Sequence, residues 1–285
     1  MGEFLSAWRL DLFVAINCAL ALCLYLYAVR RVNRGSRRPA HVLYGRWPAW
    51  CTACWTIGLA LIATVYLGPL GAWGHTFFWV HMTQHLVVTM AAAPLLVLGG
   101  PITLAYRASG AAGRRSLVRA LRSPAAQVLT NPYVTWVLFA GVLLGAHFTP
   151  FYDWALGSHG VSAMVEQPMF LIAAVLYYLP LVGPNLLPAR PSHGVRLISL
   201  GLMMIPEATI GAVIYFSPVI LYDGFDTVRP FGPNALLDQQ FAGGLMWALV
   251  MVIDSFWMMY VAAEWFGAEE RRSEREDSRM TAGAA

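Results

Sequence analysis

The segment TFFWVHMTQHLVVTMAAAPLLVL, from Thr76 to Leu98, is a continuous apolar run that contains two histidines. A helix that crosses a membrane needs about 20 predominantly apolar residues, so this segment predicts a spanning helix. Ionisable side chains inside a bilayer are costly, and where they occur they usually mark a functional site. One segment therefore predicts both the class of the protein and the position of its site.

The composition of the whole chain agrees with a membrane protein. Of 285 residues, 58% are hydrophobic and 12% are charged, against about 45–50% apolar and about 25% charged in soluble domains. This excludes a soluble enzyme, a disordered chain and a disulfide-stapled secreted module. Nucleotide-binding and hydrolase motifs are absent from the sequence, and a net charge of +4 does not indicate nucleic acid. The expected surroundings are the lipid bilayer.

Six further apolar runs flank the first segment on both sides. They cover Asp11 to Val29, Trp47 to Leu67, Pro132 to Ala146, Val161 to Val182, Val195 to Pro218, and Gln239 to Phe266. The sequence therefore predicts an all-α, polytopic bundle of about seven transmembrane helices within a single domain, residues 1–267. A charged cytoplasmic tail, residues 268–285, is expected to be frayed.

The distribution of arginine predicts the orientation of the bundle. None of the 19 basic residues is lysine, and all but Arg9 and Arg229 fall in alternate loops and the C-terminal tail. Because basic residues concentrate on the cytoplasmic side, we expect the N-terminus outside and the C-terminus in the cytoplasm of a bacterium, with the chain in its plasma membrane. The basic segment Ala105 to Ser123 is either an amphipathic helix on the inner surface or a simple topology anchor.

His81 and His85 are the strongest candidate metal ligands. They are four residues apart and therefore share one face of the predicted helix, about 8 and 14 Å below its outer end. Neutral imidazole is a suitable ligand for copper, zinc and iron. The alternative is that both histidines form hydrogen bonds with neighbouring helices.

Four further ionisable residues lie in the same outer half of the predicted bundle. They are His147, His159, Glu166 and Asp238. If their helices adjoin, these groups converge with the histidine pair on one metal site open to the outer face. The alternatives are interfacial positions for the two histidines, a bundle partner for Glu166, and a helix N-cap role for Asp238.

The sixth run carries a second candidate group around a proline kink. Thioether sulfur favours Cu(I), so Met203 and Met204 beside Glu207 are candidate ligands. Methionine is equally an ordinary core residue of membrane helices. Glu207 near mid-membrane and Asp254 deeper could instead mark a path across the bilayer.

Cys51 and Cys54 form a CxxC pair at the cytoplasmic end of the second run. Such a pair can bind Cu(I) or exchange electrons. It lies on the opposite side from the histidines, and we interpret both cysteines as buried small residues.

Several motifs in order resemble one known family. His81 to His85, continuing through Ala93 to Pro101, resembles the third-helix signature of the CtaG family of multi-span assembly factors for caa-type cytochrome c oxidase. The resemblance continues in His147 to Trp154, in Ile214 to Ser217 with Leu221-Tyr222, and in Asp238 to Trp247, and it covers roughly Trp47 to Trp265. It implies a non-enzymatic role in maturation of a copper oxidase. The implied partners are the oxidase subunits and a copper chaperone.

The resemblance also implies ligand positions. His81, His85, His147 and His159 fall on family positions proposed to bind metal. Glu166-Gln167 stands where the family tends to have Glu-His.

The residues and the resemblance together leave three functions open. The leading hypothesis is an oxidase assembly factor that binds and delivers copper at an outer His/Glu site. The second is a copper or proton-coupled transporter, and the third is a haem-binding redox protein. In the third case, His81 and His85 share a helix and could not be opposite axial ligands of one haem.

Overall fold

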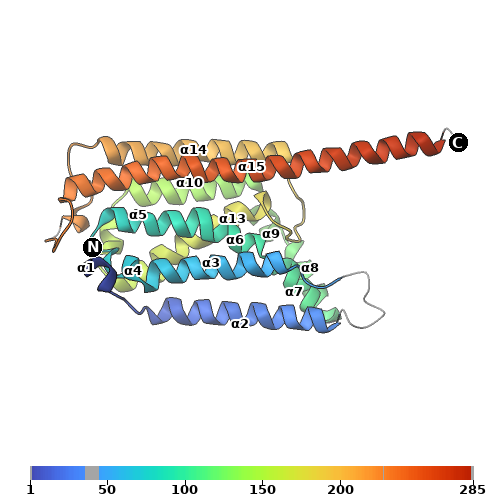
Figure 1. The fold of residues 1–285 in the computed structure, drawn as a ribbon, viewed down its shortest axis with the longest axis horizontal. Helices are drawn as coiled ribbons and strands as arrows, with labels where there is room; N and C mark the ends of the chain where they lie inside the picture. The colour runs from blue at the N-terminus through green and yellow to red at the C-terminus, as the bar shows by residue number, and fades with distance from the viewer. Residues whose placement is uncertain (1, 36–44, 227, 284–285) are drawn as a thin grey trace.

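The computed structural model describes residues 2–35, 45–226 and 228–283, and every regular element in them is a helix. The long helices lie side by side and run along one common direction (Figure 1). This confirms the predicted all-α membrane bundle.

Six apolar helical segments are long enough to cross a membrane, and α10 (Pro132–Phe148) is a shorter apolar helix beside them. The six are α2 (Leu12–Gly35), α3 (Ala49–Leu67), a composite helix of α5 (Phe78–Leu86), η2 (Val87–Ala92) and α6 (Ala93–Leu98), then η3 (Ser162–Glu166) with α13 (Gln167–Leu181), α14 (His193–Phe216) and α15 (Ala235–Gly283). A bundle of about seven spans agrees with this count.

The expected frayed tail is wrong within the described residues. Helix α15 continues to Gly283 and projects beyond the rest of the bundle (Figure 1). Residues after Phe266 are rich in alanine, glutamate and arginine, which are strong helix formers. Arg272 also pairs with Glu276 one turn later, at 3.2 Å between Nε and Oε1.

Two π-helical segments interrupt the spans next to prolines. Segment η2 ends two residues before Pro94, and η3 ends two residues before Pro168. Proline has no N–H, so Pro94 leaves the carbonyl of Met90 without its normal helical donor. The indole Nε1 of Trp257, on α15, donates to that carbonyl at 2.9 Å. The interruption is thus satisfied by a neighbouring helix.

Glycines bring α14 and α15 into backbone contact. A Cβ placed on Gly243 would lie 2.5 Å from the backbone N of Tyr215, and one on Gly211 would lie 2.9 Å from the N of Trp247. Small residues allow membrane helices to approach closely, so these two positions hold the helix pair together.

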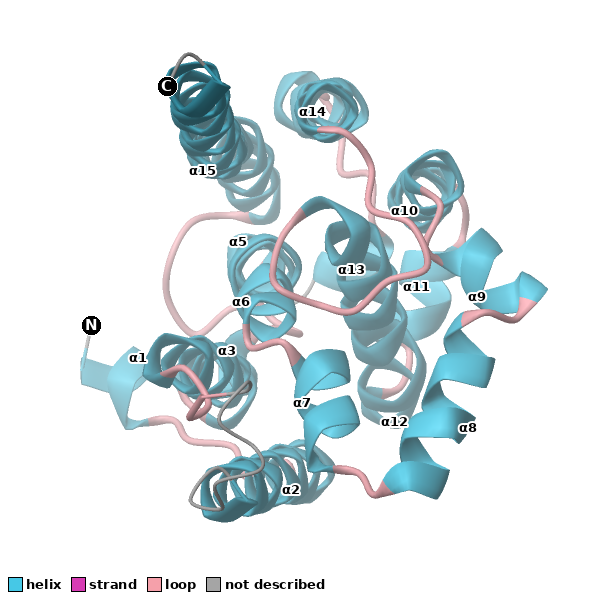
Figure 2. Cartoon of the chain, turned by 90° about the vertical axis from the view of Figure 1, so that its right-hand side faces the viewer, coloured by secondary structure: helices cyan, strands magenta, loops and turns pink. Residues whose placement is uncertain are grey.

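Three short helices connect the third span to α10 across one end of the bundle. They are α7 (Pro101–Ala108), α8 (Ala111–Leu121) and α9 (Pro124–Leu129). Gly100, with a positive φ of 64°, turns the chain from α6 into α7. Figure 2 looks along the bundle and shows α8 extended across the view while α2, α3 and α10 appear end-on.

Short helices also cover the opposite end of the bundle. They are α1 (Gly2–Ser6), α4 (Pro69–Trp73), α11 (Phe151–Leu156), α12 (His159–Val161) and η4 (Asp223–Phe225).

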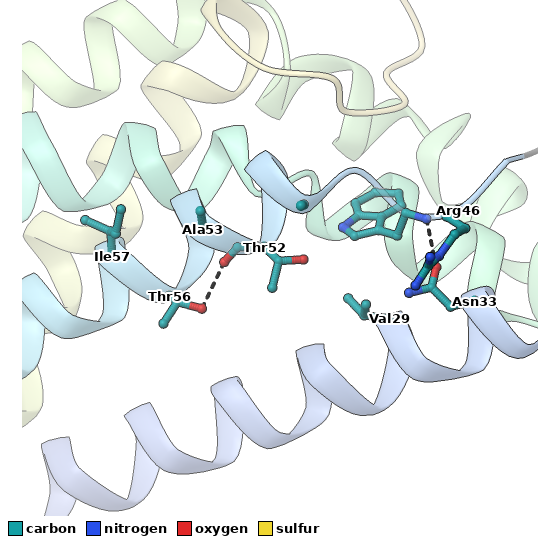
Figure 3. Close-up of a pocket in the computed structure, with 9 residues that line it drawn as sticks. Val29, Asn33, Arg46, Thr52, Ala53, Thr56 and Ile57 are labelled. Carbon is teal, nitrogen blue, oxygen red and sulfur yellow. Dashed lines mark hydrogen bonds between the residues drawn. The ribbon is translucent and has the colours of Figure 1, made fainter.

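Helix α2 is peripheral, and a groove of about 750 Å³ separates part of it from α3. Figure 3 shows Arg46 and Asn33 together at one end of this groove. The side chain of Asn33 accepts a hydrogen bond from the backbone N of Trp47 at 2.8 Å and so joins α2 to the segment just before α3. Nearby, Cys51 is buried, as expected, whereas Cys54 is only half-buried, and both are free thiols.

Candidate metal centre

Three side chains meet at one buried point near the end of the bundle covered by α11 and η4. His81 Nε2 lies 2.9 Å and His85 Nε2 lies 3.0 Å from the same oxygen, Glu166 Oε1. The two imidazole nitrogens are 2.8 Å from each other. The relative exposures are 3%, 7% and 0% for His81, His85 and Glu166. Among the described histidine, cysteine, aspartate and glutamate residues, this is the one group arranged to hold a metal ion.

Each of the three side chains is positioned by its own element. Both histidines lie on α5, one turn apart, and Glu166 is the last residue of η3. The hydroxyl of Ser162 donates to the second oxygen of Glu166, Oε2, at 2.6 Å. π-Helical turns occur frequently at functional sites, and here one of them carries the carboxylate of the centre.

With Glu166 ionised, no assignment of protons to the two imidazoles satisfies all three contacts at once. If both imidazoles donate from Nε2 to Glu166, the two donors face each other at 2.8 Å. If only one imidazole carries its proton on Nε2, only one of them donates to the carboxylate. A cation bound by all three atoms removes this conflict, because each atom then contributes a lone pair.

The donor set and its spacing fit a transition-metal ion. Ligands about 2.0–2.1 Å from a four-coordinate ion lie about 3.3–3.5 Å apart, so side-chain shifts of about half an ångström would admit one. Two imidazoles and one carboxylate suit copper, zinc or iron. The Nδ1 of His85 is buried and has no hydrogen-bond partner. Its closest ring neighbour is Phe170, with ring centroids 4.3 Å apart.

His147 lies near this centre, and the ring of Tyr152 contacts both His147 and the histidine pair. The Nδ1 of His147 donates to the carbonyl of Leu143 at 2.7 Å, so its Nε2 carries a lone pair and acts as an acceptor. The hydroxyl of Tyr152 is 3.5 Å from that Nε2. The Tyr152 ring also contacts His81, with centroids 5.4 Å apart. The structure therefore brings His147 near the three ligands without placing it among them.

Two tyrosines, Tyr152 and Tyr222, belong to the surroundings of the centre. Neither of them was identified from the sequence as part of the site. Burial raises the pKa of both Tyr152 and Tyr222, so both phenols stay protonated and act as hydrogen-bond donors. Tyr222 donates to the backbone carbonyl of His147 at 3.1 Å. The only sequence signal for Tyr152 is its place in the motif that follows His147.

Asp238 is buried but serves another purpose. Its two oxygens accept the backbone N–H groups of Phe78 and Trp79, at 2.8 and 3.1 Å, and so cap the N-terminus of α5. Arg229 Nη1 pairs with the same carboxylate at 2.6 Å. The alternative prediction, that Asp238 caps its own helix, is wrong: that cap is Asn234, which accepts from Leu237 at 2.9 Å.

The other candidates lie elsewhere. Met203 is buried in the main core and Met204 is half-buried. The carboxyl group of Glu207 contacts Asp254 and not the histidines. His159 begins α12, but its side chain lies outside the described residues.

Comparison with known proteins places the chain in a family. No solved structure matches it. An uncharacterized protein of Mycobacterium leprae is 29% identical over 286 residues, which is 96% of this chain and 42% of that protein. An uncharacterized protein of Mycobacterium bovis is 29% identical over 302 residues, again with 42% of its length covered. The chain thus spans less than half the length of these relatives.

The family model described as cytochrome c oxidase caa3 assembly factor matches residues 23–268. This range includes all of α3 to α14, the histidine pair of α5 and the carboxylate of η3. It confirms the resemblance that the motifs predicted. The chain belongs to the cytochrome c oxidase caa3 assembly factor family.

Proposed function

We propose that this protein is a bacterial plasma-membrane assembly factor for a caa3-type cytochrome c oxidase, and that it binds copper at His81, His85 and Glu166 for delivery to the oxidase. Membership of the family supports the assembly role. The oxidase subunits are then its partners, and a copper chaperone would be the donor. Copper is cargo in this proposal, and the protein catalyses no reaction.

The observation that carries the copper proposal is the convergence of three donor atoms within 3.0 Å of one another at a buried point. Glu166 supplies negative charge that offsets the charge of a bound cation. Ser162 fixes the orientation of that carboxylate through its 2.6 Å hydrogen bond. Buried charge is costly unless it is paired or bound to a metal, and the two imidazoles alone offer no permanent positive charge.

The position of His147 supports the proposed delivery of copper as well as its binding. The Nε2 of His147 lies 3.5 Å from the hydroxyl of Tyr152, whose ring also contacts His81. A shift of the Tyr152 ring would add a fourth donor to the centre. A site that can gain and lose a ligand in this way suits a cargo better than a permanent cofactor.

Copper stoichiometry in purified protein tests the proposal. We expect about one copper per chain in the wild type and none in His81→Ala/His85→Ala. His193→Ala is the matched control, because His193 stacks on Trp265 away from the centre, with ring centroids 6.3 Å apart. Copper retained by the double variant would overturn the site.

The assembly role has a separate test in cells. Deleting the gene is expected to lower the copper content and the activity of the oxidase, and wild-type protein but not His81→Ala/His85→Ala should restore both. If the double variant restores them fully, the protein assists assembly through protein contacts and not through copper.

A second function, a copper or proton-coupled transporter, is favoured by one observation. Glu207 on α14 and Asp254 on α15 are buried carboxyl groups in mutual contact, and each has one oxygen without a partner. Copper flux into liposomes that contain the protein would support transport. The assembly proposal predicts no copper flux. A Soret band in the absorption spectrum of the purified protein would instead indicate the haem-binding alternative.

A further inference from the structure

Helix α8 has an unusual position and charge for a connection between spans. It lies across the end of the bundle (Figure 2), and none of its residues is buried. It carries Arg114, Arg115 and Arg119, and Arg122 follows it directly. Residues 101–130 contain neither aspartate nor glutamate. The helix is therefore a strongly basic element parallel to the end surface of the membrane bundle.

The three arginines of α8 and Arg122 after it divide into one that is used by the fold and three that are not. Arg114 caps α7: its Nε donates to the carbonyls of Tyr106 and Ser109 at 3.2 and 3.0 Å. Its guanidinium also lies over the Tyr106 ring, 5.6 Å from the centroid. Within the described part of the chain, no ion pair involves Arg115, Arg119 or Arg122.

These three arginines share one helix face. Their spacings of four and three residues place them side by side along the helix. Like charges at such spacings repel and destabilise an isolated helix. An external anion would relieve this repulsion, since the described structure provides no acidic partner.

A surface cavity lies on the same face. It has a volume of about 640 Å³, and its walls include Tyr106, Arg114, Arg115, Arg119, Arg122 and Ser123. Arg115, Arg119 and Arg122 in the wall of this cavity offer the forks of N–H donors that bind phosphate oxygens, while Arg114 is engaged by the carbonyls of α7. The chemistry of the cavity thus selects a phosphate group.

The surroundings of the cavity select a lipid over a free phosphate. The spans end at this level, where the headgroups of a bilayer lie. Helix α9 follows at once and exposes Val128 and Leu129, at 53% and 41% of their surfaces. A phospholipid would place its phosphate among the arginines and its acyl chains against such apolar side chains. Basic segments beside spanning helices bind acidic lipids in this manner.

We propose that the α8 cavity binds the headgroup phosphate of an anionic phospholipid. The bound lipid would fix α8 against the bundle and the bundle against the membrane surface. This inference is independent of the copper centre, which lies among α5, η3 and α11 at the opposite end.

Lipid titration of the full chain tests the proposal. Delipidated protein in a neutral detergent is titrated with dioctanoyl phosphatidylglycerol, and bound lipid is counted by native mass spectrometry. Dioctanoyl phosphatidylcholine and inorganic phosphate are titrated in parallel. We expect saturable binding of about one phosphatidylglycerol per chain, and far weaker binding of the other two.

Two matched triple variants locate the site. Arg115→Gln/Arg119→Gln/Arg122→Gln removes three charges from the cavity, and Arg271→Gln/Arg275→Gln/Arg279→Gln removes three from the exposed part of α15. Each arginine near a headgroup is worth about fivefold in affinity, so the first variant should bind on the order of 100-fold more weakly. The second should bind as the wild type does. If the first does not fold, Arg119→Gln alone should lose about fivefold.

Four results would overturn the proposal. No phosphatidylglycerol binding by the wild type would exclude the site, and equal losses in both triple variants would show unspecific charge attraction. Inorganic phosphate that binds as tightly as the lipid would identify a free-anion site. Equal binding of phosphatidylcholine would show that headgroup charge is not recognised.

Discussion

At the scale of single residues, the centre depends on one carboxylate. Glu166 contacts both imidazoles through Oε1 and holds Ser162 through Oε2. The ordinary role of a buried carboxylate in a bundle is to accept hydrogen bonds from a few neutral donors. Here the carboxylate has a second role, because its charge is the only permanent one in the centre.

Glu166→Gln tests that role. The amide keeps the size and one acceptor oxygen but removes the negative charge. Loss of a residue that only supports a metal ligand typically lowers metal affinity by about 10- to 100-fold. Because Glu166 is itself a proposed ligand, we expect copper affinity to fall by more than about 100-fold. Competition with a chelator of known affinity measures the change. Glu270→Gln, exposed on α15, is the control and should leave affinity unchanged. An unchanged affinity in Glu166→Gln would show that the histidines bind copper without the carboxylate.

At the scale of elements, the third span depends on α15 to complete its hydrogen bonds. Trp257 donates to the Met90 carbonyl that Pro94 leaves free. Asp238, on the same helix, caps the first turn of α5. Two contacts from α15 therefore fix both the beginning and the interrupted middle of the span that carries the histidines.

Trp257→Phe tests the first of these contacts. The buried carbonyl of Met90 would lose its donor, at a cost of about 1–3 kcal/mol in the free energy of unfolding. Pro94→Ala should offset part of this cost in the double variant, because alanine restores a helical N–H. Unfolding in detergent, followed by circular dichroism, measures all three variants. Additive effects of the two substitutions would contradict the pairing.

The close contact of α14 and α15 gives a second prediction for elements. Gly243→Leu would force the side chain into the backbone of Tyr215, 2.5 Å from the new Cβ. Separation of the two helices is expected, with a fall in thermal stability that yields little folded protein. Gly141→Ala is the control: a Cβ at Gly141 meets open space, and the helix gains propensity. Size-exclusion chromatography and thermal scans compare the two.

At the scale of the whole molecule, much of the fold could be predicted because each span is a continuous apolar run in the sequence. The bundle, and the positions of His81, His85 and Glu166, follow from composition and helical spacing. The role of Asp238 could not be predicted in this way, because its partners on α5 lie 160 residues away in the chain. The two π segments and the position of Tyr152 likewise depend on packing between distant helices.

Orientation is the prediction that belongs to this scale. With the N-terminus outside, an impermeant maleimide applied to intact cells should label Ser6→Cys and not Ser273→Cys, in a background without the four native cysteines. The physical reason is the concentration of arginine at one side of the bundle. Labelling after cell lysis shows that both positions react. Labelling of Ser273→Cys alone in intact cells would reverse the topology.

The wide turn at η2 has a consequence for angular register along the third span. One residue of an α-helix corresponds to about 100° of rotation, so the extra residue of a π turn offsets everything on one side of it by about that angle. His81 and His85 precede this turn, and Met90 and Pro94 lie within or after it. The azimuth of the two imidazoles is therefore set separately from the azimuth of the part of the same span that follows the turn. A single-residue deletion at Val87 would straighten the turn and swing the imidazoles away from Glu166 while every side chain of the centre remained in the sequence.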